Sequence, residues 1–188
     1  MGKNNRYRRK RVIVFGFEGK NNKTETNYFS HFKPKDDRYI LKPVSCGVTD
    51  PVNMLNSIKI KRKDFDYNSR EDLTFLFVDA DCDIKKEELI AQLQSKQPKD
   101  ITIIRSNPCF ELWFLNHFCK TTKEFKSNNE LIDELKRFIP DYNKNKDYYD
   151  FLSDKIGLAI KNANSQNESA TTSKTNVVKV ISFLKEDK

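Results

Sequence analysis

Carboxylates follow two apolar segments of the chain, and their positions suit chemistry. Glu18 lies at the end of the run Val-Ile-Val-Phe-Gly-Phe-Glu-Gly, and Asp79 and Asp81 end Thr-Phe-Leu-Phe-Val-Asp-Ala-Asp. An apolar run that ends in an acid is typical of a buried parallel strand whose end enters an active site. Residues two apart on an extended segment point to the same side, so Asp79 and Asp81 can face one site.

Two acidic strand ends predict a divalent metal site. Mg²⁺ prefers a few carboxylate oxygens and completes its shell with water and phosphate, so Glu18, Asp79 and Asp81 suit one Mg²⁺ or Mn²⁺ ion. Glu25 and Asp83 could help to hold a second, since paired ions about 3.5–4 Å apart stabilise the attacking and leaving oxygens in phosphodiester cleavage. The alternative is that Asp83 only caps a helix and that Glu25 only favours a helix dipole.

Glu111 is an acid within the apolar segment Cys-Phe-Glu-Leu-Trp-Phe. If it is buried, it must be paired, protonated or metal-bound, because an isolated buried charge is very costly. It could instead face water near a helix N-terminus, where a negative charge is favourable. Its place just after a predicted strand favours a catalytic role.

Strands and helices are expected to alternate over the first 118 residues. Strands are predicted at 11–17, 39–44, 73–78 and 101–104, and Pro43 favours an edge position for the second. Helices are predicted from a Thr24 cap to about Phe32, from Thr49-Asp50-Pro51 to about Arg62, over 84–97, and from Asn107-Pro108 onward. This order predicts an α/β fold with a mostly parallel sheet and helices on both faces.

The C-terminal third is expected to be a helical elaboration of the sheet. Helices are predicted at 128–138 and 148–161, the polar segment 162–175 reads as a loop, and 177–184 as a helix or a strand. We therefore expect a basic N-terminal arm at 1–10 and a single domain at 11–188, of which 120–188 form a helical extension.

Charge and cysteine content narrow the choice of partner and compartment. Lys and Arg exceed Asp and Glu by 35 − 27 = 8, and residues 1–11 carry six basic residues and no acid. Such an arm suits a polyanion, although it could equally be a solvated tail.

The four cysteines lack Cys-x-x-Cys spacing, so zinc is not expected. The sequence shows no signal peptide and no membrane-spanning run, so we expect a cytoplasmic protein that makes no contact with a membrane.

Several enzyme classes lack their motifs in this sequence. The chain has no Gly-x-x-x-x-Gly-Lys-Ser/Thr loop for nucleotide hydrolysis, no three-glycine dinucleotide fingerprint, and no Gly-x-Ser-x-Gly element. His31 and His117 are too few for a zinc site, and His117 reads as structural.

Three segments resemble the RloB-like family, bacterial proteins related to the AbiL abortive-infection system. They are Phe-Glu-Gly followed by Thr24-Glu25-x-x-Tyr28-Phe29, then Phe-Val-Asp-Ala-Asp, and Ser-Asn-Pro-Cys-Phe-Glu-Leu-Trp at 106–113. The resemblance implies a TOPRIM-type nuclease fold, shared with topoisomerases, primases and OLD-type nucleases. The segment 20–23 is longer than the family pattern, and Cys82-Asp83 stand where such proteins often have a glycine.

The resemblance also implies roles for the acids and a setting for the protein. Glu18 would be a metal-linked acid or base, Glu25 a second ligand, and Asp79 and Asp81 metal ligands, while Glu111 belongs to the family's own motif. A large ATPase encoded nearby would be the partner.

The leading hypothesis is a Mg²⁺- or Mn²⁺-dependent nuclease in anti-phage defence that cleaves DNA or RNA, tRNA included, with Glu18, Asp79, Asp81 and Glu111 at its catalytic site. The alternatives are a non-catalytic subunit that binds nucleic acid or the ATPase, and a primase-like nucleotidyl-transfer enzyme. The sequence also allows a homo-oligomer.

Overall fold

Four strands form one sheet in which every neighbouring pair is parallel, with the order β2-β1-β3-β4. The structure, a computed structural model, describes residues 9–19, 23–32, 39–168 and 172–186. The strands are β1 (Arg11–Phe17), β2 (Tyr39–Ser45), β3 (Leu73–Asp79) and β4 (Ile101–Ser106). The predicted strands are confirmed, and β2, which contains Pro43, lies at an edge as expected. Strands β2, β3 and β4 extend one or two residues beyond their predicted ends.

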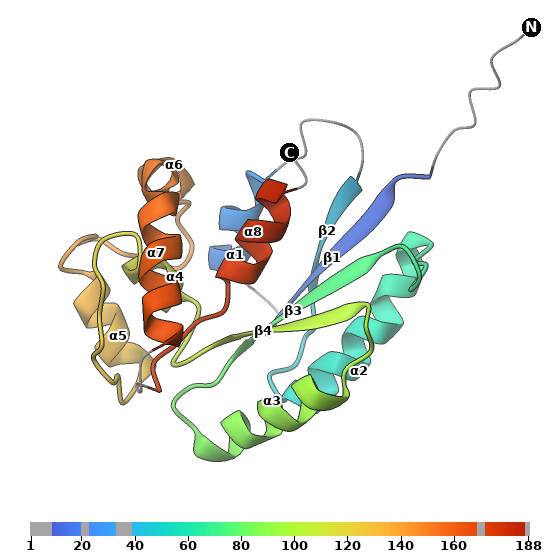
Figure 1. Cartoon of the computed structure of the whole chain (residues 1–188), viewed down its shortest axis with the longest axis horizontal. Coiled ribbons are helices and arrows are strands. Elements are labelled where there is room, and N and C mark those ends of the chain that lie inside the picture. The colour runs from blue at the N-terminus through green and yellow to red at the C-terminus, as the bar shows by residue number, and fades with distance from the viewer. Residues whose placement is uncertain (1–8, 20–22, 33–38, 169–171, 187–188) are drawn as a thin grey trace, which may run out of the picture.

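Helices cover both faces of this sheet (Figure 1). On one face lie α2 (Pro51–Lys61), which continues into the 3₁₀ turn η1 (Arg62–Phe65), and α3 (Ile84–Lys96); on the other lie α1 (Lys23–Ser30) and α8 (Val178–Glu186). Alternate strand residues enter the two cores: Val12 and Val14 pack towards α2 and α3, whereas Ile13 and Phe15 join the core on the opposite face. The predicted α/β class with helices on both faces is confirmed.

Aspartates begin the two helices of the first face. The Asp50 carboxylate accepts a hydrogen bond from the Asn53 N–H at 2.9 Å, and Pro51 occupies the first turn of α2. The Asp83 carboxylate accepts from the N–H groups of Lys85 and Lys86 at the start of α3. Both helices start where the sequence predicts.

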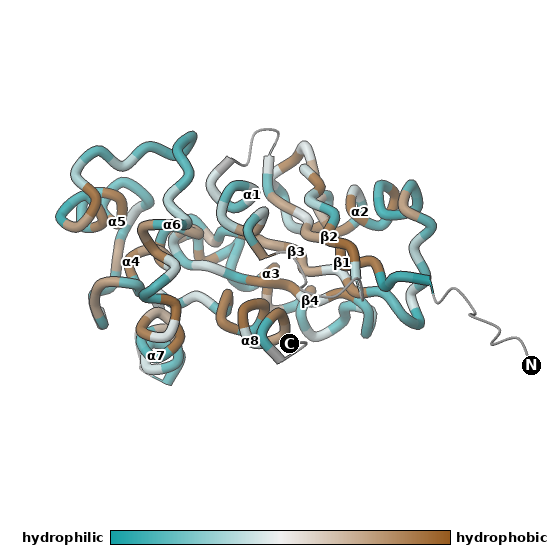
Figure 2. Tube along the Cα trace, turned by 90° about the horizontal axis from the view of Figure 1, so that it is seen from above, coloured by the Kyte–Doolittle hydropathy of each residue, from teal (hydrophilic) through white to brown (hydrophobic). Residues whose placement is uncertain are grey.

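The remaining helices form the elaboration at one end of the sheet, away from the N-terminal end of the described chain (Figure 2). They are α4 (Glu111–Leu115), α5 (Asn128–Leu135), α6 (Tyr149–Leu152) with the 3₁₀ turn η2 (Ser153–Lys155), and α7 (Ile156–Asn167). One hydrophobic core joins them to the sheet through residues such as Phe77 and Trp113. The predicted helical extension is therefore present. The boundary at residue 10 between arm and domain stays a prediction, because residues 1–8 lie outside the described residues.

One helix prediction and one loop prediction in this half of the chain are wrong. Asn107-Pro108 does not open a helix; α4 begins at Glu111, because the Asn107 side chain instead accepts from the Cys82 N–H at 3.0 Å and donates to the Thr172 carbonyl at 3.2 Å. Residues 162–167 are not a loop but the last turns of α7. Their polar side chains are used internally: Asn162 donates to the Asn116 carbonyl at 2.8 Å.

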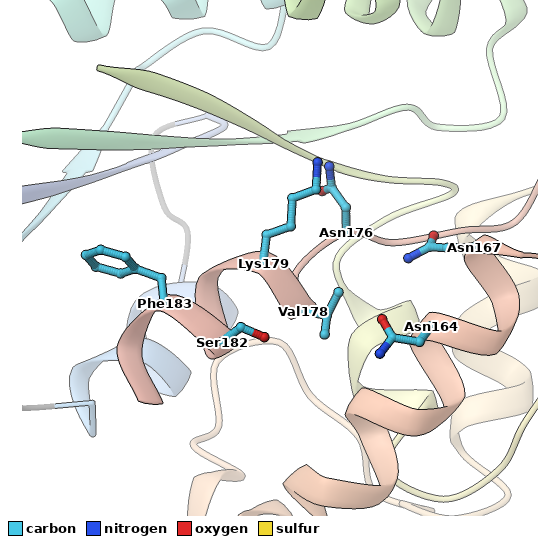
Figure 3. A pocket seen from close by; sticks show the side chains of 7 residues that line it. All are labelled: Asn164, Asn167, Asn176, Val178, Lys179, Ser182 and Phe183. Carbon is cyan, nitrogen blue, oxygen red and sulfur yellow. The ribbon is translucent and has the colours of Figure 1, made fainter. Parts of the chain in front are cut away.

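A cavity of about 460 Å³ lies between α7 and α8 (Figure 3). Asn164 and Asn167 line it from α7, and Asn176 lines it from the segment that leads into α8. The Asn176 side chain accepts from the Arg105 N–H at 2.7 Å, and the Asn176 backbone N–H donates to the Arg105 carbonyl at 3.0 Å. Asn176 thereby satisfies backbone groups at the outer edge of β4, where another strand could otherwise pair.

No helix in the described part of the chain is long and apolar enough to cross a lipid bilayer.

Candidate active site

Glu18 and Asp79 lie side by side at the point where the strand order reverses. The chain goes from β1 outward to β2 and then to β3 on the other side of β1, so the carboxyl ends of β1 and β3 flank the switch point of the sheet. The Glu18 carboxylate accepts a hydrogen bond from the Asp79 N–H at 3.2 Å. The structure thus brings together the two acids that the apolar runs predict.

Asp79 is the electrostatic centre of the acidic cluster, which we define as Glu18, Glu25, Asp79, Asp81 and Glu111. Burial raises the pKa of the Asp79 carboxyl well above its usual range, and the negative charges of the four other members raise it further. Glu18 also has a raised pKa, first because of its burial and then because of Asp81, against the opposing effect of Lys86. Five carboxylates from separate parts of the sequence therefore repel one another at one edge of the sheet.

Glu25 joins the cluster from the first turn of α1. Its side chain is half-buried, and its pKa is raised to about 7 by burial and then by the charge of Glu111. The predicted helix cap at Thr24 is wrong, because α1 begins at Lys23 and the Thr24 hydroxyl donates to the Lys144 carbonyl at 3.1 Å. Residues 20–22, which belong to the segment that is longer than the family pattern, lie outside the described residues.

Glu111 is buried at the start of α4, with 2% of its surface exposed. The Tyr142 hydroxyl donates to its Oε1 at 2.9 Å, and the Lys144 ammonium lies 3.1 Å from the same oxygen. The expectation that a buried Glu111 must be paired is confirmed, and the alternative that it faces water is wrong. A carboxylate held in this way is fixed in direction, as a positioned catalytic group must be.

Asp81 reaches the cluster through a turn and not along an extended strand. Strand β3 ends at Asp79, and both Asp81 (φ 54°) and Cys82 (φ 60°) adopt the left-handed conformation, so the period-two argument for Asp79 and Asp81 is wrong in its geometry. The Asp81 N–H donates to the Pro108 carbonyl at 2.8 Å, which holds the turn against the segment before α4. Asp81 Oδ1 accepts from Asn128 at 2.7 Å.

Asp83, the remaining predicted metal ligand, is engaged elsewhere. Its Oδ1 accepts the Lys85 N–H at 2.8 Å and the Lys86 N–H at 3.3 Å, so it serves as the N-cap of α3. This is the capping alternative that the sequence left open. The structure does not bring its carboxylate into the acidic cluster.

Two lysines that the motif analysis missed contact the acids. The Lys86 ammonium lies 2.6 Å from Asp81 Oδ2 and 3.3 Å from Glu18 Oε1, and Lys144 pairs with Glu111. Lys86 had a signal in the sequence, because a cation in the first turn of a helix opposes the helix dipole. Lys144 and Tyr142 lie in a polar loop of the extension, and no pattern marks them.

The loop that follows α5 holds α1 in place. The Thr24 hydroxyl donates to the Lys144 carbonyl of this loop. The His31 ring, just after α1, contacts the Asp147 carboxylate at 2.6 Å and stacks on Tyr149 with ring centroids 4.3 Å apart. The same loop supplies the two partners of Glu111. The helical extension therefore positions both Glu25 and Glu111 relative to the strand ends.

Several basic residues are engaged in contacts within the fold. Arg9 makes two hydrogen bonds to the buried Asp72 carboxylate, at 2.9 and 2.7 Å. Arg62 pairs with Asp100 at 2.8 Å, and Lys61 donates to the Ser45 carbonyl at 2.6 Å. The basic residues of the arm before Arg9 lie outside the described residues.

The donor chemistry of the cluster fits a hard divalent cation, because oxygen ligands suit Mg²⁺ and Mn²⁺ and the cluster holds more negative than positive charge. Within residues 9–19, 23–32, 39–168 and 172–186, no three His, Cys, Asp or Glu side chains converge closely enough to form a ready ion site. Lys86 instead supplies the positive charge between Glu18 and Asp81.

Comparison with known protein families identifies a relationship for most of the chain. The model of the family described as RloB-like protein matches residues 13–184. No curated protein and no solved structure matches the chain. The matched range contains every member of the acidic cluster and both lysines that pair with it.

Proposed function

This chain belongs to the RloB-like family, and from that premise we propose that it is a nuclease that uses Mg²⁺ or Mn²⁺ to hydrolyse phosphodiester bonds in DNA or RNA. The observation that carries the proposal is the position of Asp79. It lies at the switch point of a parallel sheet, and four further carboxylates, from the residue after β1, from α1, from the turn after β3 and from α4, raise its pKa. Ligands bind at such switch points in open α/β sheets.

Repulsion among the acids is what a cation would relieve. Glu18, Asp79 and Asp81 would hold the ion, with Glu25 as a further oxygen donor, because Glu18 is hydrogen-bonded to the Asp79 N–H and shares the Lys86 ammonium with Asp81. A bound Mg²⁺ or Mn²⁺ would offset the negative charge of a phosphodiester and polarise its oxygen. The fold would otherwise gain nothing from placing five carboxylates together.

The chain's own residues would transfer protons and keep the catalytic carboxylates in position. Glu18, which is anchored by the Asp79 N–H, is the candidate for proton transfer at the strand end. Tyr142 and Lys144 fix the Glu111 carboxylate, whose charge raises the pKa of both Glu25 and Asp79. Two hydrogen bonds hold Asp81 in the cluster. The Asn128 amide donates to its Oδ1, and its backbone N–H donates to the Pro108 carbonyl.

The defence role and the partner are part of the same proposal. The membership in the RloB-like family and the resemblance to the AbiL system support a role in abortive infection, with a neighbouring ATPase that controls the nuclease. The substrate would be a nucleic acid, and tRNA is included among the candidates.

A non-catalytic binding subunit is the competing function. The observation that favours it is that Lys86 and Lys144 already pair with three of the five acids in the structure. It predicts binding of nucleic acid or of the ATPase without cleavage, and it predicts that the acids can be neutralised without loss of defence.

Cleavage assays separate the two functions. Labelled DNA, total RNA and tRNA are incubated with the purified protein in Mg²⁺, Mn²⁺ or EDTA, with and without the neighbouring ATPase. We expect metal-dependent cleavage by the wild type, a loss of at least about a thousandfold in the Asp79→Asn, Asp81→Asn double variant, and no loss in Asp133→Asn, which removes an exposed carboxylate of α5. Activity that persists in the double variant would refute the nuclease proposal.

A further inference from the structure

Lys86 bridges the two acidic strand ends. Its ammonium lies 2.6 Å from Asp81 Oδ2, and 3.3 and 3.5 Å from the two carboxylate oxygens of Glu18. The Lys86 side chain is 14% exposed and that of Glu18 18% exposed, so this pair is largely removed from water. The ammonium therefore occupies the space between the carboxylates that follow β1 and β3.

The local sequence does not favour a lysine at this position. Asp83 is the N-cap of α3, which makes Lys86 the third residue of the helix. Acids are favoured in this first turn, because the free N–H groups and the helix dipole leave positive charge there. Lys86 is stabilised instead by Glu18 and Asp81, so its role is tied to the acidic cluster and not to α3.

We propose that Lys86 is the internal counter-ion of the acidic cluster, which neutralises Glu18 and Asp81 in the metal-free protein and leaves when a divalent cation binds. This inference rests on the proposed function, because the cation is the one that the nuclease would use. Lys86 thereby sets how much free Mg²⁺ or Mn²⁺ the protein needs before its site is loaded.

The Lys86 ammonium and a divalent cation would compete for the same carboxylate oxygens of Glu18 and Asp81. Mg²⁺ and Mn²⁺ bind carboxylate oxygens directly, and the Asp81 and Glu18 oxygens that they would use are those within 2.6–3.5 Å of the Lys86 ammonium. Asp81 is 39% exposed, and a lysine has a flexible four-carbon stem, so the ammonium can swing outward when Asp81 turns to a cation. A lysine that only aligned the carboxylates would act in the opposite sense, because its loss would weaken cation binding.

The affinity for Mn²⁺ tests the inference without any nuclease assay. Free Mn²⁺ is measured by electron paramagnetic resonance as it is titrated into the full chain in the absence of nucleic acid. We expect Lys86→Gln to lower the Kd for Mn²⁺ by about tenfold, because one competing positive charge is removed at contact distance. Lys86→Arg keeps the charge, and Lys85→Gln removes the charge of the preceding, exposed residue; both should stay near the wild-type Kd.

Thermal unfolding provides the second measurement, which also shows that the variants fold. In EDTA, Lys86→Gln should unfold at a lower temperature than the wild type, since Glu18 and Asp81 lose their counter-ion, and Mn²⁺ should raise its midpoint by more than it raises that of the wild type. A Kd that is unchanged or higher in Lys86→Gln overturns the inference, as does the absence of Mn²⁺ binding in both proteins.

The outcome is distinguishable from that of the nuclease proposal. If Lys86→Gln binds Mn²⁺ more tightly and the wild type cleaves no nucleic acid, the counter-ion role holds and the nuclease proposal fails. If the wild type cleaves in an Asp79-dependent manner and Lys86→Gln leaves the Kd unchanged, the counter-ion role fails alone.

Discussion

Neutralising Glu25 should stabilise the metal-free protein, by an amount that depends on pH. The pKa of Glu25 is about 7 in the folded protein, against a reference value of 4.5, because of burial and of the charge of Glu111. A carboxyl whose pKa is raised on folding binds its proton more tightly in the folded state. The free energy of unfolding therefore falls as the pH rises from 4.5 to 7.

The expected magnitude comes from this difference. A separation of 2.5 pKa units between 4.5 and 7 corresponds to about 3 kcal/mol at pH 8, where Glu25 is charged in both states. Glu25→Gln resembles the protonated carboxyl, so the variant should match the wild type near pH 4.5 and exceed it by up to about 3 kcal/mol at pH 8. For a domain of this size that difference is roughly 6 to 12 °C in Tm.

Urea unfolding in EDTA at pH 4.5, 6, 7 and 8 measures the effect. The quantity to compare is the free energy of unfolding of Glu25→Gln minus that of the wild type, in which the titration of groups remote from Glu25 cancels. Glu88→Gln, at an exposed position of α3, controls for the loss of a negative charge as such. A difference that is flat with pH, or that becomes more negative above pH 7, would refute the view that Glu25 lies in a repulsive acidic cluster.

Three further predictions concern the fold that carries the site. Asp72→Ala should lower the free energy of unfolding by about 3–5 kcal/mol in urea titrations, because it leaves the Arg9 guanidinium and the Val12 N–H without their buried acceptor; a loss below 1 kcal/mol contradicts this. Burial lowers the pKa of His117 to about 4, so the free energy of unfolding should fall by about 3 kcal/mol as the pH drops from 6.5 to 4. In His117→Gln this decrease should be absent, even if the variant is less stable than the wild type at pH 8. Gly16→Ala should lower the free energy of unfolding by about 1–3 kcal/mol, because the added Cβ would lie 2.9 Å from a Leu76 methyl group. Thermal unfolding measures this loss, and an unchanged Tm would contradict it by showing that the neighbouring side chains move aside freely.

The sequence predicts β1 and β3 because these two central strands are buried on both faces. The runs that end at Glu18 and Asp79 are continuously apolar, and that pattern needs no tertiary information to be recognised. The two acids follow the last buried residues of β1 and β3, so the strand prediction also places them together. This part of the site is a consequence of backbone topology.

The other half of the site depends on contacts that local patterns do not encode. Asp81 lies in a left-handed turn that is held by the Pro108 carbonyl, a backbone group 27 positions further along the chain, and Glu111 takes its partners from a polar loop. The sequence predicts a loop at the polar end of α7 for a related reason. Polar segments usually lie at the surface, whereas Gln166 is fully buried and accepts a hydrogen bond from Asn116.

These contacts make the helical extension part of the site. Glu18, Asp79 and Asp81 come from the strand ends of the sheet, but Glu111 is fixed by Tyr142 and Lys144, and α1, which carries Glu25, is held through Thr24. An ATPase that bound the loop after α5 could therefore alter the spacing of the acids without touching the sheet. Control of the proposed nuclease would then act through the position of Glu25 and Glu111, while the strand-end acids stay in place.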